Sequence, residues 1–317
     1  RRTMSSSKFV VVAAVLGLAG QGAALQIGTR APAAAVRLSV PHMQTAAATK
    51  KSTEVESMLA ANRKLVDSLG SIAPDMSELT RLRFALAFPD EADATSALRE
   101  TIAWRSGKGK AIVEAAGGAV AKAMEGGGWD NEPVRNAAPN AAAINAYIRP
   151  DNIMSLSTAD GDLVYVIRAS LIDDKALMSK VSVGDLVDFL LYVKEVHSLV
   201  VNARSAASGR LCNVIFANDI SGTRKPPDPL FGKALTESSK SYEQLYPSLA
   251  GPTMILNLPF FLQAFIGLFK PLFPKSVQAR LKFESAPVLA KLKTLTPLTT
   301  DPSAKKSFLA EVDKLLA

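Results

Sequence analysis

The chain has 317 residues, 48% of them hydrophobic, which is enough for one sizeable core and a smaller satellite domain. Its single cysteine, Cys212, excludes a disulfide framework, and the two histidines form no pair at ligand spacing, so no structural zinc site is expected. The net charge of +8 lies almost wholly in residues 1–53, which hold seven Lys or Arg residues and no acid. The remainder is close to neutral, and we expect no nucleic-acid partner.

Residues 1–53 are typical of a two-part targeting leader. Lys8 precedes an apolar run from Phe9 to Leu18, and small residues follow, which is the order found in a secretory signal peptide. Residues 25–53 are rich in Ala, Thr, Arg and Ser and contain no acid, as in a transit peptide. In series they resemble the leaders of plastids of secondary origin, which is the expected location. The alternative is a secreted protein with a disordered N-terminal linker.

Helical periodicity predicts an N-terminal helical subdomain over residues 54–145. Apolar residues recur at threes and fours over 54–70, 76–86 and 90–107, so three helices are expected. Residues 107–145 are rich in Ala and Gly and predict no definite element.

The pattern changes in residues 146–285, where strand and helix signals alternate. Strands are predicted at 163–169, 211–217 and 253–257, and the segments between them have the long apolar stripes of helices, at 183–204 and 229–246. This alternation predicts an α/β fold with a mixed, largely parallel sheet covered by helices. Residues 286–317 form a C-terminal extension with one predicted helix, over 302–316.

The most apolar segment follows the third predicted strand. A helix is expected from Pro259 to Pro271, apolar on nearly every side, with Phe261, Phe265 and Phe269 at i, i+4 and i+8. It is shorter than the roughly 20 residues that span a bilayer, and polar residues interrupt it. Such a helix is buried in a core, laid on a membrane or closed over an apolar ligand, and the spacing alone favours the core.

Three blocks in chain order resemble the CRAL-TRIO lipid-binding family, over roughly residues 76–285. Residues 82–86 and 101–105 (LRFAL and TIAWR) are similar to its N-terminal helical module, and residues 214–222 (VIFANDISG) to its central strand. Residues 246–259 and 269–272 match its last strand and gate helix. The resemblance implies that the sheet forms the floor of an apolar pocket and that the Phe-rich gate helix closes the mouth.

The resemblance also implies a function and a set of site residues. It predicts a soluble lipid-binding or lipid-transfer protein with peripheral membrane contact, which holds a phospholipid, sterol or isoprenoid and needs no other cofactor. The implied pocket and gate residues are Phe216, Leu256, Phe260, Phe261, Phe265, Ile266 and Phe269. The candidate headgroup contacts are Arg280, Lys282 and Ser248. A different reading keeps the fold but makes the chain a structural or regulatory subunit that docks on a membrane complex.

Departures from the family pattern bear on the ligand. Family members that bind phosphatidylinositol carry Glu after the Tyr-Pro pair, and a Thr and a Lys after the gate, whereas this chain has Ser248, Val277 and Arg280. We therefore expect no preference for phosphatidylinositol. The sequence contains no nucleophile elbow and no phosphate loop, and His197 borders an apolar helix face, where a core or pocket-wall histidine is expected, so no enzyme is predicted.

Overall fold

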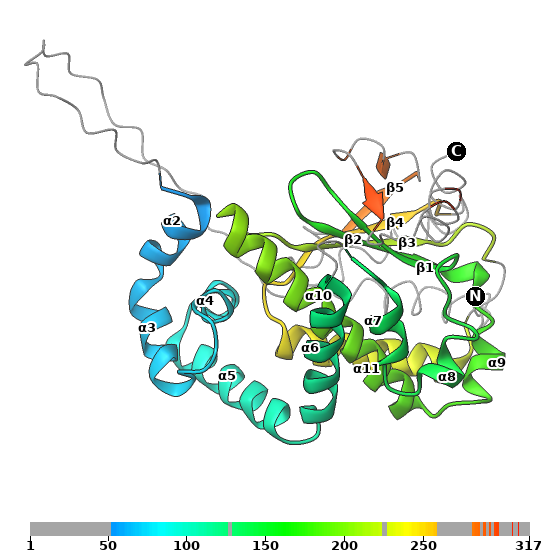
Figure 1. The fold of residues 1–317 in the computed structure, drawn as a ribbon, viewed down its shortest axis with the longest axis horizontal. Helices are drawn as coiled ribbons and strands as arrows, with labels where there is room; N and C mark the ends of the chain where they lie inside the picture. The colour runs from blue at the N-terminus through cyan, green and yellow to red at the C-terminus, as the bar shows by residue number, and fades with distance from the viewer. Residues whose placement is uncertain are drawn as a thin grey trace, which may run out of the picture.

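The computed structural model describes residues 52–125, 129–223 and 227–258, and short stretches beyond them. These stretches are residues 281–285, 288–289, 292, 295–297, 306 and 310. The leader up to residue 51 and the predicted gate helix lie outside the described residues, so the expectations for them stay predictions. The described part has an α/β fold, with a sheet packed on helices and a group of N-terminal helices beside it (Figure 1).

Four helices form the N-terminal unit: α2 (Glu54–Ala61), α3 (Arg63–Ile72), α4 (Glu78–Ala87) and α5 (Glu91–Ser106). Side chains cap three of them, because Thr53, Ser77 and Asp90 accept hydrogen bonds from first-turn N–H groups. The unit has its own core, which includes Val66, Leu69, Leu82, Phe84 and Leu98. The single helix predicted over 54–70 is two helices, since Asn62 leaves helical geometry at φ −114° and ψ 14°.

The Ala- and Gly-rich segment is mostly helical, as α6 (Lys110–Met124), α7 (Glu132–Asn136) and α8 (Ala141–Ile144). Helix α6 buries Ile112, Ala116 and Ala119 in the main core. Its two central glycines, Gly117 and Gly118, have open space where a side chain would stand. The small alanine side chains on the buried side of α6 therefore let this helix pack closely against the α/β domain.

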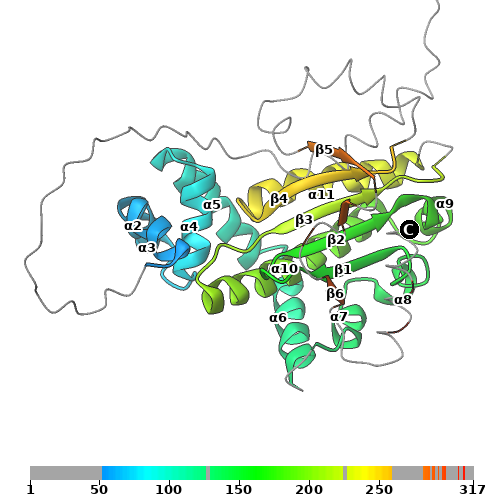
Figure 2. The ribbon, with the colours of Figure 1, turned by 90° about the horizontal axis from the view of Figure 1, so that it is seen from above.

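One six-stranded sheet organises the rest of the described chain, in the order β5-β4-β3-β2-β1-β6 (Figure 2). Strands β2 to β5 are parallel, and β1 pairs antiparallel with β2 and β6. The strands are β1 (Ile153–Ser157), β2 (Leu163–Arg168), β3 (Val214–Asp219), β4 (Ala250–Leu256), β5 (Leu281–Glu284) and β6 (Thr296–Pro297). The predicted mixed, largely parallel sheet is confirmed.

Two crossover connections, from β2 to β3 and from β3 to β4, run through helices on one side of the sheet. Helix α10 (Val183–Ser208) joins β2 to β3, and α11 (Pro229–Leu245) joins β3 to β4. The short η1 (Ala169–Leu171) and α9 (Asp174–Met178) lie between β2 and α10. Among the described helices, none combines the length and the apolar composition that crossing a membrane requires.

The sheet therefore has two different faces. The helix face packs on α6, α10 and α11 and contributes Leu163, Tyr165 and Phe216 to the main core. The opposite side, which we call the second face, belongs to a separate apolar cluster. Its strand residues are Met154, Leu156, Val164, Val166, Ile215, Ala217, Met254 and Leu256.

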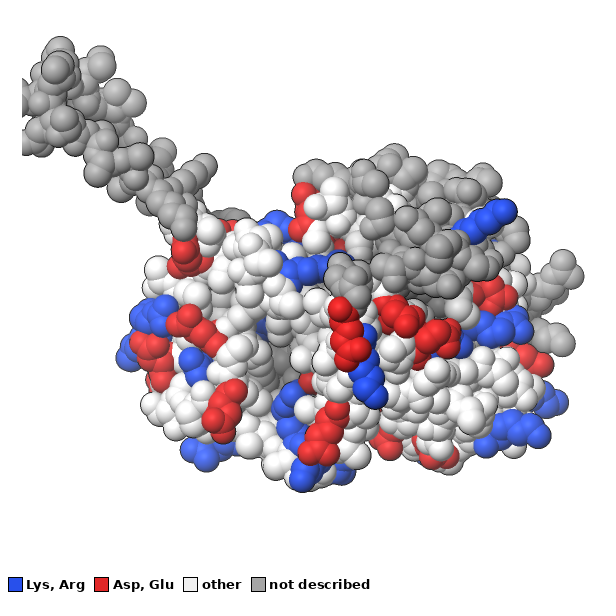
Figure 3. Space-filling model, in the orientation of Figure 1, with Lys and Arg blue, Asp and Glu red and all other residues white. Residues whose placement is uncertain are grey.

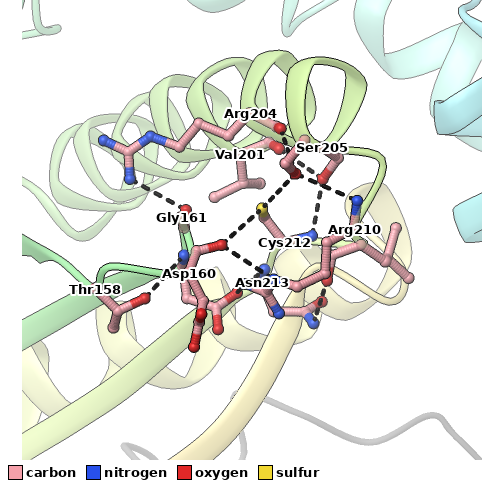
Figure 4. Close-up of polar contacts among 12 residues, drawn as sticks. Thr158, Asp160, Gly161, Val201, Arg204, Ser205, Arg210, Cys212 and Asn213 are labelled. Carbon is pink, nitrogen blue, oxygen red and sulfur yellow. Dashed lines mark hydrogen bonds and ion pairs between the residues drawn. The ribbon is translucent and has the colours of Figure 1, made fainter. Parts of the chain in front are cut away.

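A network of hydrogen bonds joins the turn between β1 and β2 to the C-terminal end of α10 (Figure 4). Glycine suits this predicted turn for two reasons. Gly161 has φ +94°, which other residues rarely adopt, and a Cβ there would lie only 3.1 Å from the Cys212 sulfur. Arg204 Nη1 donates to the Gly161 carbonyl at 3.1 Å, and the Cys212 N–H donates to Ser205 Oγ at 2.8 Å. Cys212 is a buried free thiol, as predicted.

Candidate functional site

The centre of the second face is built from aliphatic side chains. Because successive strand residues point to opposite sides, each strand gives alternate positions to this face. The eight residues are buried, and they carry no nitrogen or oxygen in their side chains. Val288, Leu289, Leu292 and Leu295 pack against them from the C-terminal part of the chain. These eight side chains offer a ligand apolar contact. By the same alternation Arg168 and Asp219 lie on this face at the carboxyl ends of β2 and β3, where Arg168 Nε is 3.7 Å from Asp219 Oδ2.

The two pocket residues predicted on strands lie on opposite sides of the sheet. Leu256 belongs to the second face. Phe216 instead points toward the helices, where its ring centroid lies 6.2 Å from that of Tyr165 and 5.7 Å from that of Tyr242. A pocket on the second face can therefore use Leu256 but not Phe216, because strand alternation turns the phenylalanine away from it.

The helix face surrounds a buried lysine. The Lys194 Nζ of α10 lies 4.3 Å from the centroid of Phe216, 4.9 Å from that of Tyr165 and 5.0 Å from that of Tyr242. Burial lowers the pKa of Lys194 to about 7 by penalising its charged form, while the three ring faces favour that form. This cluster was not predicted from the sequence, although Lys194 follows Leu190 by four residues and so lies near the apolar stripe of the helix.

Two neighbours of Lys194 on α10 are also buried. Arg105 of α5 donates two hydrogen bonds to the Glu195 carboxylate, at 2.8 and 2.9 Å, in the parallel arrangement that suits a guanidinium. His197 Nε2 lies 3.3 Å from Ser155 Oγ, and burial together with the Lys194 charge lowers the pKa of this imidazole to about 3. His197 is therefore a core histidine, and within the described residues no three His, Cys, Asp or Glu side chains converge as metal ligands.

A buried carboxylate holds the point where the chain leaves β4. Asp219, at the end of β3, accepts hydrogen bonds from Ser221 N at 3.0 Å, from Ser221 Oγ at 3.1 Å and from Asn257 Nδ2 at 2.9 Å. Asn257 has φ +55°, a left-handed conformation that asparagine tolerates better than most residues. These bonds fix the direction in which the backbone enters the predicted gate segment.

The structure describes two of the three candidate headgroup residues, Ser248 and Lys282. Ser248 precedes β4, and its carbonyl accepts a 2.6 Å hydrogen bond from Arg83 at the side of the N-terminal helices. Lys282 of β5 is exposed and is in register with Met254 of β4. Arg280 lies outside the described residues, as do the gate residues Phe260, Phe261, Phe265, Ile266 and Phe269. Their contacts with a ligand stay predictions.

A comparison with protein families identifies the domain that contains the sheet. The family model of the CRAL/TRIO domain matches residues 153–299. Among solved structures, the crystal structure of Sfh5 is similar, with a TM-score of 0.47, 12% sequence identity, and coverage of 80% of this chain and 98% of that one. No curated protein matches the sequence. Residues 153–299 thus form a CRAL/TRIO domain, and domains of this family bind hydrophobic ligands such as lipids.

Proposed function

We propose that this protein binds a lipid with its acyl or isoprenoid part against the second face and carries it between membranes. The observation that supports this most is the composition of that face, where four adjacent strands present eight aliphatic side chains. The Phe-rich segment that follows Asn257 would close over the ligand as a gate. Its sequence is apolar on nearly every side, as a surface that alternates between ligand and bilayer requires.

Burial supplies the physical mechanism of carriage. Each methylene hidden from water stabilises the complex by ~0.8 kcal/mol, so two acyl chains of about sixteen carbons would cost on the order of 25 kcal/mol to expose. A lipid therefore cannot leave through water at a useful rate. A pocket as apolar as the bilayer makes exchange nearly neutral in free energy, and the opening of the gate then sets the rate.

The test of this proposal is lipid transfer between vesicles, measured together with thermal melting. Phe265→Asp should slow transfer at least ten-fold while the melting temperature changes little, because the ring would face lipid or bilayer. The control is Phe231→Asp in α11, a buried core position on the helix face, which should collapse the melting transition. Equal collapse in both variants would make Phe265 an ordinary core residue. Unimpaired transfer in a stable Phe265→Asp variant would exclude the gate.

Headgroup selection is a finer part of the proposal. Ser248 and Val277 replace the acid and hydroxyl of inositol-binding relatives, so transfer of phosphatidylinositol should be no faster than that of phosphatidylcholine, a sterol or a carotenoid. A competition assay with mixed donor vesicles measures this directly. A strong preference for the inositol lipid would contradict it.

The location is proposed from the leader alone. The signal-like run and the acid-free segment after it support import into a plastid of secondary origin. A fluorescent fusion that lacks residues 4–53 should stay in the cytosol, whereas the intact fusion should reach the organelle. If the truncated fusion reached the organelle, the targeting signal would lie outside residues 4–53.

A further inference from the structure

A cleft of about 530 Å³ lies between the N-terminal helices and the α/β domain, on the helix side of the sheet. Figure 3 shows the hollow between these two parts of the molecule. Residues 72–77 and helices α4 and α5 form one wall, and α10 with residues 245–249 forms the other. Small-molecule sites are commonly of this size and often lie where two structural units meet.

The cleft is separate from the proposed lipid site. Helix α10 lines the cleft with Ser198 and Leu199 and packs on the helix face of the sheet, whereas the proposed lipid site is on the second face. The sheet therefore stands between the two. The N-terminal helices and the α/β domain have separate hydrophobic cores. The cleft lies between these cores, in space that the side chains of neither core fill.

Most of the cleft wall is apolar. Its members come from both units and include half-buried side chains that a ligand could cover further. The main apolar residues are Ile72, Phe84, Ile102, Val113, Leu199 and Leu245. An occupant must therefore be largely apolar, since a polar one would lose its hydration without replacement hydrogen bonds.

The polar groups of the wall are mostly bonded within the protein. Arg83 is 3% exposed, and it donates to Asn202 Oδ1 at 2.8 Å and to the Cys212 and Ser248 carbonyls at 2.6 Å each. Arg105 differs, because its side chain is 31% exposed and Glu195 uses only two of the five N–H donors of a guanidinium. Arg105 can therefore donate to an oxygen of a ligand.

Charge in the cleft is balanced. The cations Arg83 and Arg105 face the anions Glu195 and Asp75 among the lining residues. A ligand carboxylate at Arg105 would lie beside the Glu195 carboxylate, and an ammonium group would lie beside the guanidinium. Each arrangement places like charges close together in a poorly solvated site, which costs free energy.

From this geometry we infer that the cleft is a second ligand site, which binds an uncharged, single-chain amphiphile with its hydroxyl or carbonyl oxygen at Arg105. The apolar chain lies between α4, α5 and α10. The inference is independent of the proposed transfer function, because it concerns different residues on the other side of the sheet.

Calorimetric titration of the full chain tests this inference with three probes of equal length: decan-1-ol, decanoate and decylammonium. The protein is first incubated with phosphatidylcholine, so that any site on the second face is filled. Ser198→Phe places a ring in the cleft and should weaken decan-1-ol binding at least ten-fold. Thr236→Phe adds the same ring on the exposed side of α11 and should leave binding unchanged. Decanoate and decylammonium should bind at least ten-fold more weakly than decan-1-ol.

The possible outcomes separate the two sites. If Ser198→Phe melts abnormally, Val113→Phe fills the cleft from α6 and takes its place, with the same expected loss. Absence of decan-1-ol binding, equal binding of the charged probes, or binding that a folded cleft variant leaves intact would each overturn the inference. Ala217→Leu, on the second face, should affect phosphatidylcholine loading and not decan-1-ol binding. A chain that fails to load phosphatidylcholine, yet shows the Ser198 effect, would disprove the lipid-transfer proposal alone.

Discussion

The two faces of the same sheet have opposite chemical characters. The helix face combines apolar residues with Ser155, Tyr165 and the buried Lys194 of α10, and a hydrogen bond or a ring contact holds each of these three. The second face is aliphatic over its eight central residues and carries the Arg168–Asp219 ion pair at the carboxyl ends of β2 and β3. Buried polar groups need specific partners, so the helix face permits one arrangement, whereas aliphatic surface accepts many. The difference supports the proposal that the helix face is the fixed scaffold and that a lipid lies against the second face.

The largest expected effect concerns the charge buried on the helix face. Lys194 has a pKa of about 7 in the folded chain against 10.5 when unfolded, so between these values the unfolded state binds more protons. The free energy of unfolding should therefore rise as pH increases from about 7 toward 10.5. Below pH 7 the buried charge lowers the free energy of unfolding by up to about 5 kcal/mol, at 1.36 kcal/mol per pKa unit. The attraction between the ammonium group and the three aromatic rings reduces this penalty.

Chemical denaturation between pH 6.5 and 9.5 checks this effect. Lys194→Met should remove most of the pH dependence and raise stability at the lower pH values. The exposed Lys233→Met variant should keep the slope of the parent chain. Above pH 10 the raised pKa of Tyr165 acts in the opposite direction, because the unfolded tyrosine ionises first. Identical slopes in the Lys194→Met variant and the parent would show that the ammonium is not buried.

A matched pair of leucines compares the two faces directly. Leu163 on the helix face and Leu256 on the second face are both 0% exposed. Leu163→Ala should lower the free energy of unfolding by about 3 kcal/mol, because fixed neighbours leave a cavity. Leu256→Ala should cost clearly less when lipid is bound, since a mobile chain can fill the space. Equal losses in loaded and unloaded protein would mean that both faces are ordinary core.

The smallest effect is expected at the exposed edge of the sheet. Lys282 lies on β5 in register with Met254, so its side chain is on the side of the second face. Lys282→Gln should weaken binding to anionic vesicles by about 1 kcal/mol, or roughly five-fold, whereas Lys240→Gln on α11 should not. Sedimentation with phosphatidylserine vesicles at low and high salt measures both. A larger loss for Lys240→Gln would place the membrane on the helix side.

Local signals were sufficient for the long elements of the fold. Helices α10 and α11 and strands β2, β3 and β4 were predicted because their apolar periodicities are strong and Asp160-Gly161 marks a turn. Strand β1 was missed, since its five residues, IMSLS, are too short a signal to predict a strand without the pairing with β2. Helix α6 was not predicted because glycines interrupt its pattern, and only packing on the domain shows why alanines suit it.

The candidate site was less predictable than the fold. The family resemblance, now confirmed by the domain match, implied a sheet floor and so led to Leu256. It did not assign Phe216 to either face of the sheet, because the expected strand over 211–217 did not fix which alternate positions face the helices. The Arg105 pair with Glu195 and the cleft beside it join residues about 90 positions apart, and no local pattern reports such a contact.

The most direct test of the account is to find where a bound lipid lies. The intact chain is loaded with a phosphatidylcholine that carries a diazirine on one acyl chain, and the crosslinked residues are mapped by peptide mass spectrometry after irradiation. Labelling should concentrate on second-face positions such as Met154, Val166 and Met254. Labelling confined to the helix face or to the cleft beside Leu199, with the second face unmodified, would contradict the central claim.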